Sequence, residues 1–203
     1  MPKIDLKKEN KSFYYPSTRA VSLLELPEMK FLMIDGQGDP NSSKEYQDAM
    51  ETIFPIAYKT KFISKKEKSK DYVVMPLEGL WWVDKMEDFS LDDRSSWKWT
   101  MMIRQPDFIS EKLIKMAKDE VEKKKNPPAL SKIRFESFKE GSAAQIMHIG
   151  PYGEAEALAV QKIHDFIENE GFELRGKHHE IYISDMRRTK PENLRTVIRQ
   201  PFG

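Results

Sequence analysis

The tetrapeptide IRQP occurs twice in this chain, at residues 103–106 and again at residues 198–201. A repeated tetrapeptide can arise by chance, so it is informative only if the residues before each copy also follow a common order. They do, because each copy is preceded by two strand-like runs, a turn rich in glycine, a helical pattern and two more strand-like runs. The chain is therefore predicted to consist of two equivalent halves, and this constrains the fold more than any other feature.

Periodicity and turn residues delimit the elements of the two halves. The predicted strands of the first half are residues 19–26, 30–35, 72–83 and 97–104, and those of the second half are residues 132–139, 144–149, 180–184 and 194–199. The first two strands of each half are expected to be joined by a turn, at residues 27–28 and at residues 140–142. In the first half, a helix follows the capping-box pattern of Ser42 and Glu45, and Pro55 is expected to kink or shorten it. In the second half, a helix follows the HIGPYGE turn, which corresponds to the IDGQGDP turn of the first half.

This order of elements predicts one α+β domain at residues 19–203. Its pseudo-repeats are residues 19–108 and 130–203, and a connector helix at 110–125 joins them. Each helix needs a sheet face that buries its apolar residues, so the two halves are expected to merge their sheets and to leave a ligand cleft along the pseudo-two-fold seam. Residues 1–18 are polar and rich in lysine, and we expect them to form a loose N-terminal arm.

Composition excludes several classes of protein. The chain has 203 residues, a net charge of +1 and no cysteine. A balanced charge argues against a broad nucleic-acid interface, so no direct nucleic-acid binding is expected. The lack of cysteine excludes disulfides, thiol catalysis and cysteine-ligated metal. Because we find no signal-peptide pattern and no apolar run of membrane-spanning length, we expect a cytoplasmic protein that does not associate with membranes.

Glu180 and Tyr182 are the leading candidates for chemistry. In the strand-like run EIYIS they share one face, while Ile181 and Ile183 share the other. If the isoleucines contact the helix layer, the carboxylate and the phenol lie side by side on the open face and can act as a general acid/base and orienting pair. This stretch alone favours a solvent-facing surface pair over a pocket. If both side chains lie on the helix-covered face, neither functional role holds.

Aromatic residues are expected around the open face of the sheet. The candidates for ligand binding are Glu78, Trp81, Trp82, Trp97, Trp99, His148 and Tyr152. For each tryptophan alone, core packing is the simpler explanation. Together, aromatic rings and one or two carboxylates suit a flat, lipophilic and often cationic ligand, because ring faces attract a cation and a carboxylate neutralises it. An unpaired carboxylate in such a pocket has a raised pKa, which also suits acid/base chemistry.

The histidines raise the question of a metal site. His178 and His179 directly precede Glu180, and all three residue types are metal ligands. Adjacent residues of a strand point to opposite faces, however, so the two histidines cannot easily hold one ion. We therefore expect no metal. No nucleophile elbow, P-loop or dinucleotide motif is present, so no cofactor is expected either.

Five segments, taken in order, resemble a known family. They are KFLMIDGQGDPN, YVVMPLEGLWW, MMIRQPDF, QIMHIGPYGEAEA and HHEIYISDMRRTKPENLRTVIRQP, and they resemble the GyrI-like (DNA gyrase inhibitor-like) small-molecule-binding proteins. The resemblance begins near Arg19, covers nearly the whole chain, and is strongest to stand-alone bacterial and archaeal members. It implies an SHS2-type, effector-binding-domain-like fold, in which strand–helix–strand–strand halves surround a pseudo-two-fold cleft.

The resemblance also implies a function. GyrI-like domains are the effector-binding modules of multidrug-responsive regulators, where aromatic rings and a buried glutamate bind lipophilic cations. Some stand-alone members resemble hydrolases that open the cyclopropane ring of cyclopropanoid DNA-alkylating compounds. The family's pocket glutamate and tyrosine correspond to Glu180 and Tyr182, its aromatic cluster to Trp81 and Trp82, and Tyr152 is a weaker correspondence. The resemblance therefore favours a pocket pair over a surface pair. The chain lacks a helix-turn-helix pattern, so the DNA-reading role is not expected.

Two functions remain as alternatives. As an enzyme, the protein would stack a cyclopropanoid against Trp81 or Trp82 and an aromatic residue of the WKW strand. Glu180, assisted by Tyr182, would deprotonate a water that attacks the strained ring, and a phenol or Glu78 would donate to the developing charge. As a binding protein, it would sequester or sense amphipathic drugs without chemistry, and either activity would protect against xenobiotics. Inhibition of a protein such as gyrase is a weaker alternative. One carboxylate serves either of the first two functions, so the sequence does not separate them.

Overall fold

The structure is a computed structural model, and it describes residues 3–86, 89 and 93–203. Its helices are α1 (Leu6–Glu9), α2 (Lys11–Tyr14), α3 (Lys44–Lys68), α4 (Glu111–Lys125) and α5 (Glu154–Asn169), with short 3-10 turns at Leu130–Lys132 and Pro191–Asn193. Its strands are β1 (Ser22–Gln37), β2 (Leu77–Trp82), β3 (Lys98–Gln105), β4 (Arg134–Ile149), β5 (His178–Tyr182) and β6 (Arg195–Pro201). Within the part of the chain that the structure describes, none of the helices could span a membrane.

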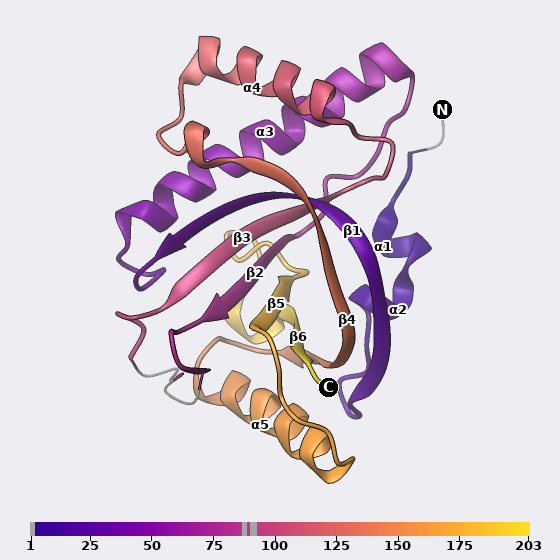
Figure 1. Cartoon of the computed structure of the whole chain (residues 1–203), viewed down its shortest axis with the longest axis vertical. Coiled ribbons are helices and arrows are strands. Elements are labelled where there is room, and N and C mark those ends of the chain that lie inside the picture. The colour runs from indigo at the N-terminus through magenta and orange to yellow at the C-terminus, as the bar shows by residue number, and fades with distance from the viewer. Residues whose placement is uncertain (1–2, 87–88, 90–92) are drawn as a thin grey trace. The chain divides into compact units, whose positions relative to one another are not determined.

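The order of elements confirms the predicted α+β class. From β1 to β3, and again from β4 to β6, the chain runs strand, helix, strand, strand, and α4 occupies the segment between the two series (Figure 1). The chain divides into two compact units, and each contains segments from both series. Unit 1 comprises residues 1–9, 29–75 and 94–138, and unit 2 comprises residues 10–28, 76–93 and 139–203.

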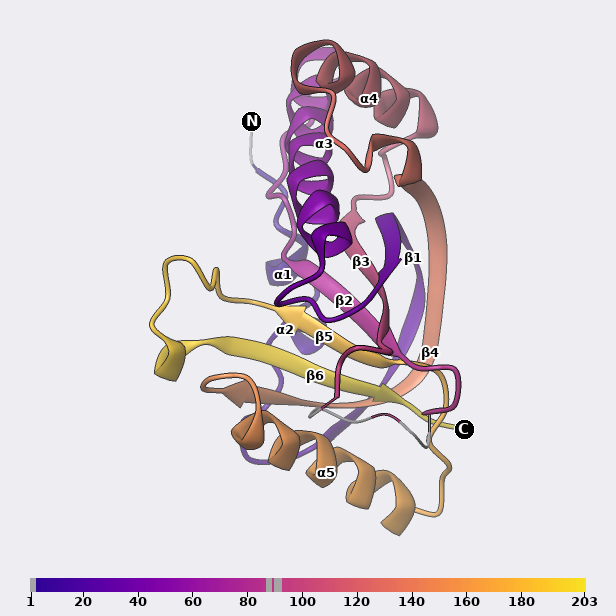
Figure 2. The same ribbon diagram turned by 90° about the vertical axis from the view of Figure 1, so that its left-hand side faces the viewer.

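Unit 1 combines a pair of strands with two long helices. The second part of β1 pairs antiparallel with β3, from Lys30 opposite Gln105 to Gln37 opposite Lys98. Helix α3 packs along α4 and also contacts β3 (Figure 2). Its N-cap is Ser43, one residue beyond the predicted cap, and the Ser43 side chain accepts a hydrogen bond from the backbone N–H of Tyr46 at 3.3 Å. Pro55 lies inside this 25-residue helix and does not shorten it, because the contacts of α3 with α4 and β3 offset the loss of one backbone hydrogen bond.

Unit 2 holds four antiparallel strands in the order β2-β5-β6-β4. Helix α5 packs across β6 (Figure 2). Its apolar residues recur at helical spacing and meet the apolar residues of β4 and β6 in one core. This core consists of Ala144, Ile146, Ile163, Ile167, Ile198 and Phe202. The helix therefore covers the face of β4 and β6 that carries Ile146 and Ile198.

Each predicted pair of short opening strands is instead one 16-residue strand, β1 in the first half and β4 in the second. β1 continues through Pro27, and β4 continues through Gly141, whose φ of +75° bends the strand without reversing it. The division between units falls after residue 28 in β1 and after residue 138 in β4. The turn signals therefore mark the places where each long strand passes from one unit to the other.

The N-terminal residues also differ from the expected loose arm. In unit 1, Ile4 forms a parallel bridge with Tyr72. In unit 2, Tyr14 is buried, and the backbone carbonyl of Phe13 accepts a hydrogen bond from Arg199 at 2.8 Å. Apolar residues among the lysines anchor this segment, and the count of lysines alone did not reveal them.

The two IRQP copies end β3 and β6, and their arginines and glutamines are buried. Gln105 accepts a hydrogen bond from the Tyr72 hydroxyl at 3.1 Å. Gln200 donates to the backbone carbonyl of Arg175 at 2.8 Å. Each copy thus supplies a buried polar pair where the last strand of its half ends, and buried polar groups of this kind need partners.

Candidate ligand and active site

Strand β5 carries polar side chains on both of its faces. Alternation places His178, Glu180 and Tyr182 on one face, and His179 and Ile181 on the other. The antiparallel register sets Trp81 of β2 opposite His178, so Trp81 belongs to the first group. The two groups form separate hydrogen-bond networks, which differ in their access to solvent and in the chemistry they can support.

The first network runs from Trp81 to Glu180. The indole Nε1–H of Trp81 donates to the hydroxyl oxygen of Tyr182 at 3.1 Å, and this hydroxyl donates to Glu180 Oε2 at 2.7 Å. Glu180 and Trp81 are 5% and 2% exposed, while Tyr182 keeps intermediate exposure. A phenol that accepts one hydrogen bond and donates another has a fixed orientation, and it aligns the carboxylate behind it.

Two more side chains complete this cluster. His178 Nε2 lies 3.1 Å from Glu180 Oε1, so each carboxylate oxygen of Glu180 has its own partner. The Tyr152 ring meets the Tyr182 ring edge to face, with centroids 6.1 Å apart. Burial raises the pKa of Tyr152 to about 12, and the negative charge of Glu180 contributes to this rise. Tyr152 therefore keeps its proton at neutral pH and is available as a donor.

The second network lies on the reverse face of β5 and centres on His179. Its Nδ1 lies 2.9 Å from Glu140 Oε1 and its Nε2 lies 3.1 Å from Glu78 Oε2. Burial alone would lower the pKa of His179, but the charge of Glu140 and hydrogen bonds to both carboxylates raise it to about 9. Burial likewise opposes ionisation of Glu140, yet His179 and Arg199 lower the pKa of this carboxyl to about 2. The imidazole is therefore a buried cation held between two carboxylates.

Arg199, from the second IRQP copy, completes the reverse-face network. Its guanidinium donates to Glu140 Oε2 at 3.1 Å, to Gln145 Oε1 at 2.9 Å and to the backbone carbonyl of Phe13 at 2.8 Å. Arg199 and Glu140 are both nearly inaccessible to solvent. Such a paired and saturated cluster stabilises one arrangement of strands and offers no accessible reactive group. Among the described residues, however, Glu78 Oε1 has no hydrogen-bond partner.

The structure corrects the assignment of faces on β5. Glu180 lies opposite Ile198 in the β5–β6 register, and Ile198 packs with Ile163 and Ile167 of α5. Glu180 therefore shares the helix-covered face, and Ile181 does not meet the condition set for an open-face pair, because it lies on the reverse face. The α5 residues instead meet isoleucines of β4 and β6, because the helix lies across those strands.

A location on the helix-covered face was expected to exclude a function for Glu180 and Tyr182. It removes the argument that the two side chains are accessible because no helix covers their face of the sheet. Helix α5 packs on β6, however, and the rings of Tyr182 and Tyr152 both keep intermediate exposure. The hydroxyl of the partly exposed Tyr182 donates a hydrogen bond of 2.7 Å to the buried carboxylate of Glu180, and so connects solvent to that carboxylate. The case for a site therefore rests on the polar network and its two tyrosine rings.

The other predicted site residues are dispersed. Glu78 belongs to the reverse-face network. Trp82 is half-buried, and the ammonium of Lys177 lies 3.2 Å from its ring centroid. His148 lies on the same face as Tyr182, since both are opposite Thr196 of β6, and its Nε2 lies 3.0 Å from the carbonyl oxygen of Pro151.

Trp97 and Trp99 belong to unit 1 rather than unit 2. Trp99 is fully buried and meets the Tyr46 ring edge to face at 5.3 Å. Trp97 is also buried, and the Arg94 guanidinium lies 5.0 Å from its ring centroid. Both rings therefore take part in the packing of unit 1, as core aromatic residues commonly do.

Sequence reasoning did not assign a role to His178, His179, Glu140 or Arg199. The signal for His178 was present, because extending the alternation of EIY back by two residues places it beside Glu180. The signal for Glu140 was not, because the sequence predicted a turn there. The two histidines point to opposite faces, and among the described residues no group of three or more His, Asp or Glu side chains is arranged so that it could hold a metal ion.

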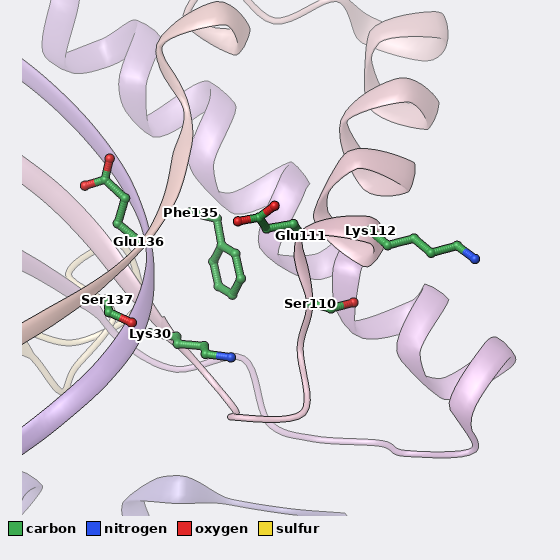
Figure 3. A pocket seen from close by; sticks show the side chains of 7 residues that line it. All are labelled: Lys30, Ser110, Glu111, Lys112, Phe135, Glu136 and Ser137. Carbon is green, nitrogen blue, oxygen red and sulfur yellow. The ribbon is translucent and has the colours of Figure 1, made fainter.

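A separate pocket of about 440 Å³ opens in unit 1, lined by Lys30, Ser110, Glu111, Lys112, Phe135, Glu136 and Ser137 (Figure 3). None of the predicted site residues lines it. Its lining carries charges of both signs around one phenyl ring, and Glu111, Lys112 and Glu136 are exposed. It has no buried, hydrogen-bonded carboxylate comparable to Glu180, so it is a weaker candidate for a lipophilic ligand.

The comparison with known families places the chain in a class of small-molecule-binding domains. Residues 19–202 match the sequence model of the GyrI-like small molecule binding domain. The chain belongs to the GyrI-like family.

Solved structures extend this comparison. An uncharacterized conserved protein from Listeria innocua is 42% identical, with a TM-score of 0.92 over 99% of this chain and 100% of that one. A hydrolase from Listeria innocua is also 42% identical, with a TM-score of 0.88 over 100% of both chains. The EcmrR C-terminal domain is 15% identical, with a TM-score of 0.57 over 91% of this chain and 97% of that one, and shares the fold alone. No curated protein matches the chain.

Proposed function

We propose that this protein binds lipophilic aromatic or cationic small molecules at the Trp81–Tyr182–Glu180 cluster and hydrolyses cyclopropanoid alkylating compounds there. The observation that carries the proposal is the continuous hydrogen-bond chain from the Trp81 indole through the Tyr182 hydroxyl to the Glu180 carboxylate. A relative of 42% identity described as a hydrolase supports a catalytic function over simple binding.

Binding follows from the rings and the charge of the cluster. Tyr152 and Tyr182 offer two partly exposed aromatic rings, and the Glu180 carboxylate lies 2.7 Å behind the Tyr182 hydroxyl. An aromatic ligand gains stacking and edge contacts from the rings. A ligand with positive charge also gains from the carboxylate, which is shielded from water and therefore interacts strongly.

Catalysis would use the carboxylate as a general base. Glu180 takes a proton from a water molecule, and the water oxygen forms a bond to a ring carbon of the cyclopropane as the strained carbon–carbon bond breaks. The electron pair of the broken bond moves through the conjugated system to the carbonyl oxygen, which becomes a phenolate and then receives a proton. The net reaction is the addition of one water molecule, with no oxidant or reductant.

A donor for the developing phenolate is also available. Tyr152 remains protonated because burial raises its pKa to about 12, and its ring is adjacent to Tyr182. A hydrogen bond from Tyr152 to the phenolate oxygen would stabilise the charge as it forms. Glu78 is not a suitable donor, because it bonds His179 on the reverse face of β5.

The test is to incubate the purified protein with a cyclopropanoid alkylator and to follow products by mass spectrometry, alongside Glu180→Gln. The amide keeps the size of the side chain but cannot accept a proton from water. We expect the wild type to form a water adduct with many turnovers. We expect Glu180→Gln to lose turnover while it retains affinity for a neutral aromatic ligand.

The outcome also decides between hydrolysis and sequestration. Tight stoichiometric binding, with the compound recovered unchanged, would refute hydrolysis and establish a protein that sequesters or senses drugs. In that case Glu180→Gln should lower affinity itself, and more for a cation than for a neutral ligand. N-methylquinolinium and 1-methylnaphthalene make a suitable pair of probes, because they differ mainly in charge. Failure to bind either probe would refute both functions.

A further inference from the structure

The carboxylate of Glu180 is held from both sides. His178 Nε2 lies 3.1 Å from Oε1, and the Tyr182 hydroxyl lies 2.7 Å from Oε2. All three side chains project from one face of β5 at two-residue intervals. The proposed reaction assigns a role to Tyr182 and Glu180 but none to His178, which is 2% exposed and lies deepest of the three.

Two partners restrict a carboxylate more than one partner does. The terminal torsion of a glutamate is broad, so one hydrogen bond leaves the carboxylate plane free to pivot. A separate donor on each oxygen fixes that plane and the direction of the remaining lone pairs. An ionised carboxylate only accepts hydrogen bonds, so the arrangement requires that Nε2 of His178 carries the hydrogen.

Aromatic residues also lie beside His178. The Phe89 ring lies 5.9 Å from it at an interplanar angle of 37°, and Trp81 lies opposite His178 in the β2–β5 register. Orienting a catalytic base through a third side chain requires this kind of support, because the orienting group must not move. The adjacent His179 bonds two carboxylates on the reverse face and stabilises the strands. The HHE sequence thus places two histidines with different environments side by side.

We propose that His178 is a positioning residue for Glu180. Its Nε2–H holds Oε1 and fixes the carboxylate plane in the orientation in which Glu180 accepts the proton of the attacking water. His178 acts through Glu180 and does not touch the substrate. This inference rests on the proposed function, and it predicts that the hydrogen bond from position 178 matters rather than the imidazole as such.

The kinetic test compares His178→Gln with His178→Ala. The glutamine amide nitrogen reaches about as far as Nε2 and can donate to Oε1, whereas alanine cannot. We expect His178→Ala to lower kcat for the cyclopropanoid by about 10–100-fold with little change in KM, and His178→Gln to recover most of it. Melting temperatures exclude variants that fail to fold.

Two kinetic outcomes would overturn the inference. Wild-type turnover in a folded His178→Ala variant would show that Tyr182 alone orients the carboxylate. A His178→Gln variant as impaired as His178→Ala would show that the shape of the ring against Phe89 matters, and not its hydrogen bond.

A spectroscopic test separates this inference from the proposed function. Long-range proton–nitrogen NMR of the histidine rings reports which nitrogen carries the hydrogen, and loss of a signal in His178→Gln assigns His178. We expect an Nε2–H ring whose signal shifts in Glu180→Gln, even if no cyclopropanoid is hydrolysed. A ring protonated at Nδ1 alone, or a signal unaffected by Glu180→Gln, would refute the positioning role whatever the activity.

Discussion

The indole of Trp81 donates a hydrogen bond to the hydroxyl of Tyr182 at 3.1 Å, although the two residues are 101 positions apart in the chain. Trp81 comes from β2 and Tyr182 from β5, and the pairing of these strands brings them together. The same hydroxyl donates a hydrogen bond to Glu180. The orientation of the Glu180 carboxylate therefore depends on one strand from each half of the chain.

Replacing Tyr182 with phenylalanine should therefore impair catalysis more than binding. Tyr182→Phe removes the hydroxyl that connects Trp81 to Glu180 and retains the ring. We expect kcat for the cyclopropanoid to fall by about 10²-fold or more, with affinity for 1-methylnaphthalene within about threefold of wild type. Steady-state kinetics and titration calorimetry measure the two effects. Tyr58→Phe, at an exposed position on α3, is the matched control. Unchanged kcat in Tyr182→Phe would contradict a role for the hydroxyl.

Gly36 and Trp99 face each other in the β1–β3 pair of unit 1. A Cβ at Gly36 would lie 2.2 Å from an atom of the Trp99 ring, which is too close for any real contact. Gly36→Ala should therefore destabilise the protein by about 2–4 kcal/mol, as measured by urea unfolding, because the buried ring has little room to move. In a Trp99→Leu background the same change should cost much less, and additive effects would show that the clash is not the cause.

Arg199 depends on the geometry of its guanidinium, which bonds Glu140, Gln145 and the carbonyl of Phe13. Arg199→Lys keeps the charge but cannot reach three acceptors from one planar group. We expect a loss of about 2–4 kcal/mol in the free energy of unfolding. Arg195→Lys, at an exposed position of the same strand, should change it by less than about 0.5 kcal/mol. Equal effects of the two substitutions would argue against a special role for Arg199.

The reverse-face network predicts a pH dependence of stability. His179 has an ordinary pKa of 6.5 and a folded pKa of about 9, so its contribution is complete below pH 6.5 and is lost as the pH rises through 9. Glu140 has an ordinary pKa of 4.5 and a folded pKa of about 2, so its contribution is present above pH 4.5 and is lost as the pH falls to 2.

Unfolding in urea at several pH values tests this window. The wild type should lose stability between pH 6.5 and about 9, by up to about 3–4 kcal/mol, since the pKa of His179 rises from 6.5 to about 9 on folding and one pKa unit corresponds to about 1.4 kcal/mol. His179→Gln cannot bind the proton, so it should be less stable at pH 6.5 and should lack this decline. A decline of the same size in His179→Gln would assign the alkaline dependence to other groups.

Periodicity and turn chemistry were sufficient for the order of elements. The helical spacing of apolar residues predicted α3, α4 and α5, and the alternation in WKWTMMIR predicted β3. Turn signals were less reliable. Pro27 and Gly141 occur inside long strands, because a proline or a glycine disfavours regular pairing at one position without forcing the chain to reverse. Pro55 remains inside α3 because tertiary packing compensates for one missing hydrogen bond.

The α+β class, the strand–helix–strand–strand order and the placement of Glu180 beside Tyr182 could all be inferred from the amino-acid pattern, because local periodicity fixes which side chains share a face. Three features could not be inferred in this way: which face α5 covers, the separation of Trp81 and Glu180 from Glu78 and His179, and the bond of Arg199 to Glu140. These choices depend on the register between strands and on the packing of a helix across them. Both are contacts between residues far apart in the chain, which no local pattern encodes.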